Sequence, residues 1–157
     1  MSRAELPSVL RMAHEELHDE MVQATRLGGE TGVAAKAVVR VLFPHVLLEE
    51  EFGIPPLSLL PRLARGEISP DMASVLRWTE LLKAEMPRML HEHKLIVEAL
   101  QVFLRAATAE QHTGYARLAQ KLILHAQLEE EVLYPASIVV GEYVRLKLSL
   151  TQHPSGA

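Results

Sequence analysis

HVLLEEE, at residues 45–51, recurs 80 positions later as HAQLEEE at residues 125–131. A proline follows each histidine by ten residues, and six of the eleven positions from histidine to proline are identical. Residues four apart on an α-helix lie about 40° apart around its axis and roughly 6 Å apart along it. The histidine and the first glutamate of each run therefore point the same way, so that both can bind one metal centre.

The composition favours a single all-helical domain. The 157 residues are enough for a proper core, and they are 48% hydrophobic but only 4% aromatic. Stretches rich in β-branched and aromatic residues are scarce, whereas good helix formers are frequent.

Charge and cysteine content exclude several classes of function. The net charge is −4 with neutral histidines, and there is no basic face, so nucleic acid is not an expected partner. Without cysteine the chain has no disulfide, no thiolate metal site and no thiol nucleophile. There is no run of 18 apolar residues, and residues 2–5 do not resemble a signal peptide. We therefore expect a soluble, cytoplasmic monomer or weak homodimer with no membrane partner.

Apolar residues at helical spacing predict two helices in the first half of the chain. The first should begin within residues 2–7, where a capping box precedes a proline, and it should stop at Gly28. The second should have Thr31 as its N-cap and be kinked by Pro44, which removes one backbone hydrogen bond. It should end at Pro55.

The second half predicts two further main helices. Residues 57–69 should form a long connection, and residues 69–71 (Ser-Pro-Asp) are a typical helix start. Pro87 should bend or divide the third helix. Residues 106–112 should form a polar turn, and the fourth helix should stop near Pro135.

An internal repeat organises these helices. RMAHE at residues 11–15 resembles RMLHE at residues 88–92, and each precedes a helix that carries His-x-x-x-Glu. A two-helix repeat used twice predicts an all-α, antiparallel, up-and-down four-helix bundle with approximate two-fold symmetry. Residues 137–150 should add a short C-terminal helix. We therefore predict one bundle domain over residues 1–150 and a frayed tail over residues 151–157.

The two histidine–glutamate pairs indicate a metal site. A single histidine on an apolar helix face is more often a hydrogen-bonded core residue, and three consecutive glutamates usually form a solvated face. Here, however, two pairs stand at the same register on faces that should be buried. Four buried ionisable groups without partners would cost many kcal/mol, and a metal cluster removes that cost.

The ligand types restrict the metal. Imidazole and carboxylate without thiolate suit iron, manganese or zinc. Four or five histidines with two carboxylates exceed what one zinc needs, and they suit two irons bridged by carboxylates. A ferritin-like di-iron bundle would need Glu-x-x-His on two helices, but only Glu15 and His18 have that spacing.

These motifs, in this order, resemble the hemerythrin-like family, whose members are also called HHE cation-binding domains. The resemblance covers about residues 8–136 and includes the closing Tyr134-Pro135. It implies a non-haem di-iron centre, with oxo or hydroxo and carboxylate bridges, inside a four-helix bundle. It also implies terminal histidines and one open position for O2, NO, peroxide or a small anion.

The resemblance assigns metal ligands residue by residue. The implied ligands are His14, His18, His45, Glu49, His93, His125 and Glu129. On the third helix His91 and His93 lie about 200° apart, and we choose His93 because it shares a face with Met89 and Ile96. Glu50 and Glu130 are fallback ligands, whereas Glu51 and Glu131 should point towards solvent.

Two features differ from the oxygen carriers of that family, which use His-x-x-x-x-Asp on the last helix and a doubled histidine on the third. Here the last pair is His-x-x-x-Glu, and the doubled histidine, His14 and His18, lies on the first helix. This departure argues against reversible oxygen carriage but leaves the metal site in place.

Three functions remain open at this point. The first is binding or sensing of O2 or NO, and the second is an enzyme that acts on peroxide or NO, or a protein that donates iron in stress repair. The third is iron storage or a metal-stabilised interaction module. A ligand pocket could be lined by Leu17, Met21, Leu48, Met89, Ile96 and Leu128. The sequence does not place any of the three tyrosines, Tyr115, Tyr134 and Tyr143, at the metal.

Overall fold

The computed structural model describes residues 5–152, and the side chains of residues 5–149. The described residues are almost entirely helical and form no strand, which confirms the all-helical prediction. The longer helices are α1 (Ser8–Ala24), α2 (Gly29–Leu48), α4 (Val75–Ala109), α5 (Thr113–Leu128) and α6 (Tyr134–Gln152). The shorter elements are the π turns η1 (Glu49–Gly53) and η4 (Glu129–Leu133), the 3-10 turns η2 (Pro55–Leu59) and η3 (Pro70–Ser74), and helix α3 (Leu60–Ala64).

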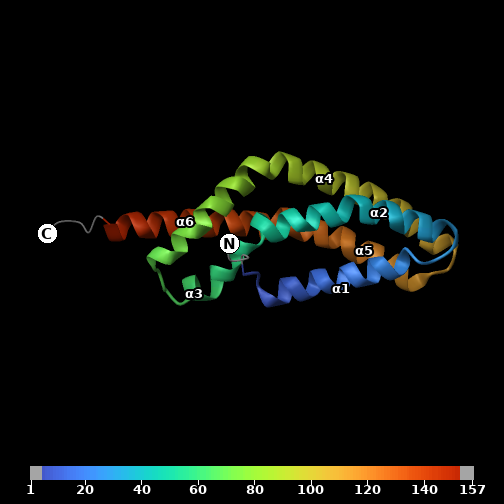
Figure 1. The fold of residues 1–157 in the computed structure, drawn as a ribbon, viewed down its shortest axis with the longest axis horizontal. Helices are drawn as coiled ribbons and strands as arrows, with labels where there is room; N and C mark the ends of the chain where they lie inside the picture. The colour runs from blue at the N-terminus through green and yellow to red at the C-terminus, as the bar shows by residue number, and fades with distance from the viewer. Residues whose placement is uncertain (1–4, 153–157) are drawn as a thin grey trace.

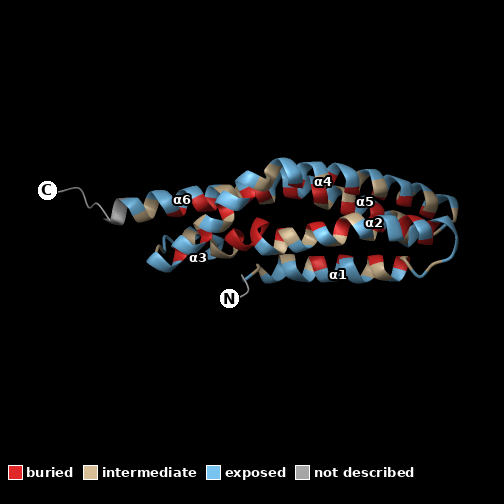
Figure 2. Cartoon of the chain, turned by 45° about the horizontal axis from the view of Figure 1, so that its top comes forward, coloured by how far each residue is buried: buried red, intermediate tan, exposed pale blue. Residues whose placement is uncertain are grey.

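The helices pack as a bundle (Figure 1). α2 packs against α1 and α4, and α5 packs against the same two helices, while α6 lies against α4 and η2. Buried residues face the interior of the bundle, and exposed residues cover its outside (Figure 2). The largest apolar cluster joins α1, α2, α4 and α5, and its buried residues include Met21, Val38, Leu100 and Phe103. A second cluster lies around Phe52, Leu82 and Tyr134.

The start of α2 differs from the prediction. Thr31 is not its N-cap, because α2 already begins at Gly29 and the Thr31 side chain is buried. Glu110, just beyond α4, caps this end instead: its carboxylate accepts hydrogen bonds from the backbone N–H groups of Glu30 (2.8 Å) and Thr31 (3.0 Å). A carboxylate is well placed there, since a helix N-terminus carries unpaired N–H groups and partial positive charge.

The other helix starts also differ in detail. α1 begins at Ser8 after Pro7, and Ser2 of the expected capping box lies outside the described residues. Ser69 precedes η3 without a capping hydrogen bond from its side chain, and the regular helix α4 begins only at Val75.

The two internal prolines do not interrupt their helices. Pro44 lies inside α2, and Pro87 lies inside α4, which continues as a single helix of 35 residues. α4 is visibly bent along its length (Figure 1). Each proline removes one backbone N–H from the ladder, which a long packed helix can tolerate by bending. Of the two alternatives predicted for Pro87, bending or dividing its helix, the structure therefore has the bend.

A π turn follows each of the two repeated motifs. In η1 the N–H of Ile54 bonds the carbonyl of Glu49 at 2.9 Å, and in η4 the N–H of Tyr134 bonds the carbonyl of Glu129. These bonds span five residues, whereas those of an α-helix span four. Each π turn thus begins at the glutamate of a His-x-x-x-Glu pair, and such turns are frequent at functional sites.

The fourth helix does not stop near Pro135, contrary to the prediction. α5, η4 and α6 follow one another without a break from residue 113 to residue 152. Pro135 is the second residue of α6, directly after the π turn η4, and the helical path continues past it despite the backbone N–H that it lacks. The expected separate helix over residues 137–150 is therefore the greater part of α6.

The connection between the halves is more ordered than predicted. Residues 57–69 were expected only to form a long connection, without secondary structure being assigned to them, and η2 and α3 occupy residues 55–64. Pro55, Pro56 and Leu57 are buried, so this segment packs against the bundle and does not loop through solvent. Within this segment, η2 contacts both α4 and α6.

One helical run, Gly29–Gly53, is long and apolar enough to cross a membrane by length and composition alone. The core helix of a soluble protein passes the same test, and 39% of the apolar window is buried inside this protein. The run also carries His45 and Glu49 into the interior. The fold is therefore compatible with a soluble protein.

Candidate metal centre

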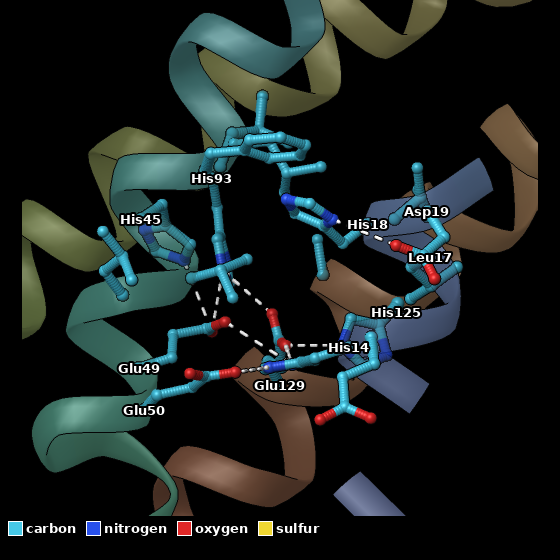
Figure 3. A pocket seen from close by; sticks show the side chains of 18 residues that line it. His14, Leu17, His18, Asp19, His45, Glu49, Glu50, His93, His125 and Glu129 are labelled. Atoms are coloured by element: carbon cyan, nitrogen blue, oxygen red, sulfur yellow. Dashed lines mark hydrogen bonds and ion pairs between the residues drawn. The ribbon is translucent and has the colours of Figure 1, made fainter. Parts of the chain in front are cut away.

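Six of the seven residues predicted as metal ligands meet inside the bundle (Figure 3). His45, Glu49, His93 and Glu129 form one cluster, named group A, and all four are buried. His14 and His125 form a second cluster with Glu129, named group B, in which His125 is half-buried. In each group the candidate ligand atoms lie within 4.8 Å of one another, so each could hold a metal ion.

Both glutamates face both groups, one oxygen to each. Glu49 Oε1 lies 3.3 Å from His45 Nε2 in group A, while Glu49 Oε2 lies 3.8 Å from His14 Nε2 in group B. Glu129 Oε2 lies 3.2 Å from His93 Nε2, while Glu129 Oε1 lies 2.7 Å from His125 Nε2 and 3.6 Å from His14 Nε2. A carboxylate that presents one oxygen to each of two ligand clusters is arranged to bridge two metal ions.

One atom of this site lacks the bonding that its burial requires. Glu129 Oε1 is buried and accepts no hydrogen bond, although His125 Nε2 lies 2.7 Å away. A buried carboxylate oxygen in that state costs free energy unless another group compensates it. A cation between groups A and B would do so, and the donor set of imidazole nitrogens and carboxylate oxygens suits a transition metal.

Three outer carboxylates hold the histidine rings. Nδ1 of His45 contacts Glu92 Oε2 at 2.7 Å, and Nδ1 of His93 contacts Glu130 Oε1 at 3.0 Å. Nδ1 of His14 contacts Glu50 at 3.4 Å. In each ring Nε2 is left to face the carboxylates of the site. Metal-binding histidines are commonly oriented in this way, by a carboxylate on the nitrogen that does not bind the metal.

The sequence did not anticipate these roles. Glu50 and Glu130 were expected only as fallback ligands, and Glu92 had no role. One feature of the sequence could have revealed all three: each directly neighbours a residue of the site, namely Glu49, Glu129 or His93.

The charges of the site are strongly coupled. Burial alone would lower the pKa of His93, but the neighbouring carboxylates of Glu129 and Glu49 outweigh burial and raise the pKa to about 10. The pKa values of His14 and His45 are raised in the same manner by neighbouring glutamates. Burial opposes ionisation of Glu129, yet the three histidines around it hold its pKa well below the ordinary value. In the metal-free site, protons on the histidines therefore balance the charge that metal ions would balance in the loaded site.

Tyr134, the residue directly after η4, also reaches group A, and the sequence analysis did not place it there. The side chain is fully buried, and its hydroxyl donates a hydrogen bond to Glu49 Oε1. Burial and the charges of Glu49 and Glu129 raise the pKa of this phenol above its usual range. The available signal was the Tyr134-Pro135 pair itself, but an α-helix would place residue 134 about 140° away from Glu129. The π turn changes that phase.

The remaining predicted ligand, His18, does not join either group. Its side chain is 53% exposed, contacts Asp19 at 3.4 Å and stacks on Phe43 with ring centroids 4.2 Å apart. His91 is exposed and points away from the site that His93 enters. Glu51 and Glu131 are exposed, as their angular position predicts. His153 lies outside the described residues.

A pocket of about 440 Å³ opens beside the site. All six clustered residues line it, with His18 and Asp19 among its more exposed residues (Figure 3). The apolar wall consists of Leu17, Leu42, Phe43, Val46, Leu47, Ile96, Leu122 and Ala126. Of the six predicted wall residues only Leu17 and Ile96 are present. Met21, Leu48 and Met89 lie in the apolar clusters, and Leu128 is exposed.

The fold and the site together define a class of protein: an all-helical bundle with a buried histidine–glutamate cluster that could hold metal. No family model, curated protein or solved structure matches this chain. The assignment of a function therefore depends on the residues of the chain and on their geometry.

Proposed function

We propose that this protein is a hemerythrin-like, non-haem di-iron protein. The four helices of its bundle are α1, α2 with η1, α4, and α5 with η4, each antiparallel to the next, and α6 is the additional helix. The contacts of α2 and α5 with both α1 and α4 support this arrangement. The π turn after each His-x-x-x-Glu pair supports a two-helix repeat.

One observation carries the proposal. Glu49 and Glu129 each direct one oxygen to group A and the other to group B, and a pair of histidines completes each group. Two carboxylates in this relation can bridge two irons, one at each histidine pair. A single zinc would use one group and leave the other buried and uncompensated.

The function we propose is the binding or sensing of O2, NO or a related small molecule. A pair of irons with an open position supplies the affinity for such molecules when it is bound. The protein contributes an apolar wall around Leu42, Val46 and Ile96, against which a small uncharged molecule can pack, and the outer carboxylates, which hold the histidine rings. We place this activity in the cytoplasm.

Elemental analysis of protein purified from iron-replete cells tests the cofactor. We expect two irons per chain, with magnetic coupling between them. One tightly held zinc and no iron would contradict the proposal.

Substitution of the glutamates tests the bridging role. Glu49→Ala and Glu129→Ala should each lose the coupled pair, because each removes one ligand from both irons and negative charge from between them. Glu51→Ala and Glu131→Ala are matched controls from the same motifs and are exposed, so both should keep it. Iron stoichiometry and magnetic coupling measured on all four variants decide the matter. Loss of magnetic coupling in Glu51→Ala or Glu131→Ala, with coupling kept in Glu49→Ala and Glu129→Ala, would mean that the wrong glutamate of each motif was assigned as the bridge.

The small molecule is tested by absorption spectra of the iron-loaded protein under O2, NO and H2O2. Binding or sensing predicts a stable new spectrum with O2 or NO. A spectrum that changes only transiently with H2O2, with O2 release or substrate oxidation, would instead favour an enzyme that acts on peroxide.

A further inference from the structure

Tyr134 makes the surroundings of the two repeated His-x-x-x-Glu motifs different from each other. It follows His125 by nine positions, and the residue nine positions after His45 is Ile54. Both residues close a π turn through their backbone N–H, and both are fully buried. Only Tyr134 can present an oxygen atom to the site, so the two halves are not equivalent.

The Tyr134 oxygen lies among the ligand atoms of group A. It is 3.1 Å from His93 Nε2 and 3.3 Å from His45 Nε2, and it contacts Glu49 Oε1. Those nitrogens are the ones left for metal, because Nδ1 of each ring contacts an outer carboxylate. The ring of Tyr134 stacks on His93 with centroids 5.5 Å apart, which fixes its direction.

These separations are those of neighbouring ligands on one metal ion. Ligand atoms about 2.1 Å from a six-coordinate metal lie about 3 Å apart when they are neighbours. The distances from the Tyr134 oxygen to the two nitrogens match that value, as does the 3.3 Å between His45 Nε2 and Glu49 Oε1. The hydrogen bond to Glu49 accounts for one of these contacts, but it does not require the oxygen also to lie beside both Nε2 atoms.

We propose that Tyr134 is a metal ligand at group A, through its phenol oxygen. This inference rests on the proposed di-iron function and names a ligand that the His-x-x-x-Glu pattern does not contain. On binding ferric iron the O–H bond breaks, an oxygen–iron bond forms and the proton leaves to solvent. No electron is transferred.

The consequence is that the two metal positions differ. Group A then offers His45, His93, Tyr134 and the two shared glutamates, whereas group B offers only His14, His125 and those glutamates. Tyr134 does not line the pocket. An incoming small molecule therefore binds at group B, where fewer protein ligands are present.

The test is spectroscopic. Wild-type protein is loaded with ferric iron, its iron content is measured, and its visible absorption and resonance Raman spectra are recorded. We expect a visible charge-transfer band from tyrosinate to ferric iron, with tyrosinate ring modes enhanced when the laser excites that band. Tyr134→Phe should lose both features and retain iron, since the ring and its stacking on His93 are kept. Tyr115→Phe and Tyr143→Phe, at tyrosines remote from the site, should keep both features.

The possible failures are distinguishable. Wild-type protein that holds two irons without tyrosinate modes would overturn the inference and leave the di-iron proposal intact, with Tyr134 acting as a hydrogen-bond donor to Glu49. Unchanged spectra in Tyr134→Phe would also overturn it. Wild-type protein that binds no iron would overturn the proposed function and the inference together. If Tyr134→Phe does not fold, the wild-type Raman spectrum alone decides.

Discussion

At the scale of single residues, the buried histidines of this site are each held at two points. Nε2 faces the shared carboxylates of Glu49 or Glu129, and Nδ1 of His14, His45 and His93 contacts an outer glutamate. The outer contact fixes which nitrogen carries the proton and which way the ring points. Metal affinity should therefore depend on residues that do not touch the metal.

Glu92→Gln is expected to weaken metal binding at group A by about 10- to 100-fold, because it removes the charge that orients His45. Competition with a chelator of known affinity measures the effect. Glu98→Gln, at an exposed position on the same helix, is the matched control and should leave the affinity unchanged. Glu92 also accepts a hydrogen bond from Arg88, and equal affinities for both variants and wild type would show that this is its only role.

The residues that sequence analysis could place are those on regular helix. His45 and Glu49, like His125 and Glu129, are four positions apart within or at the end of an α-helix, so their relative direction follows from spacing alone. His93 could be chosen over His91 for the same reason. Tyr134 could not be placed, because it lies beyond a π turn whose extra residue changes the phase. His18 was expected at the site from spacing, but its ring stacks on Phe43 and stays half-exposed.

At the scale of elements, the close packing of α6 on α4 depends on a glycine. A Cβ added at Gly141 would lie only 2.7 Å from Thr79 Cβ and from Thr79 Cγ2. Real Cβ atoms essentially never approach so closely, so a larger residue would push the two helices apart. This contact could not be predicted from the sequence, because a glycine within a helical pattern has several explanations. Likewise, Pro135 was expected to end a helix that in fact continues as α6.

Gly141→Ala should destabilise the protein by about 1–2 kcal/mol, since overpacking outweighs the gain in helix propensity. Gly114→Ala is the matched control: it is also helical, nothing lies within 4 Å of its added Cβ, and it should be neutral or slightly stabilising. Urea denaturation measures both. A stabilised Gly141→Ala protein would mean that α6 is not seated against Thr79.

At the scale of the whole molecule, protons and metal compete for the site. Rising pH should therefore destabilise the metal-free protein and strengthen metal binding. Without metal, the raised pKa values of His14, His45 and His93 mean that the folded protein binds protons more tightly than the unfolded chain. Stabilisation of this kind is complete below the ordinary histidine pKa of 6.5 and is lost as the pH rises through the folded pKa, about 10 for His93. Metal competes with those protons, so its binding strengthens as the pH rises.

Metal-free protein should therefore lose stability between about pH 6.5 and pH 8, whereas reconstituted protein should not. The difference in Tm between the two forms should widen from pH 5 to pH 8. Thermal melts of both forms at four pH values check this, and His91→Ala, at an exposed histidine, is a control that should change neither series. Superimposable melts of the two forms across the range would mean that the histidines bind no metal.

The cap that Glu110 places on α2 also sets how α2 and α4 are aligned along their length. Two distant side-chain contacts join the α2–η1 segment to α4 and the residue after it: Thr31 with Glu110 at one end, and Glu49 with His93 at the other. Glu49 follows Thr31 by 18 positions, and His93 precedes Glu110 by 17. At 1.5 Å per residue these arms are about 27 Å and about 26 Å long, so fastening one end sets the alignment of the other. An insertion or deletion within either arm would shift the residues beyond it by about 1.5 Å and rotate them by about 100° per residue, so it would turn Glu49 or His93 away from the site.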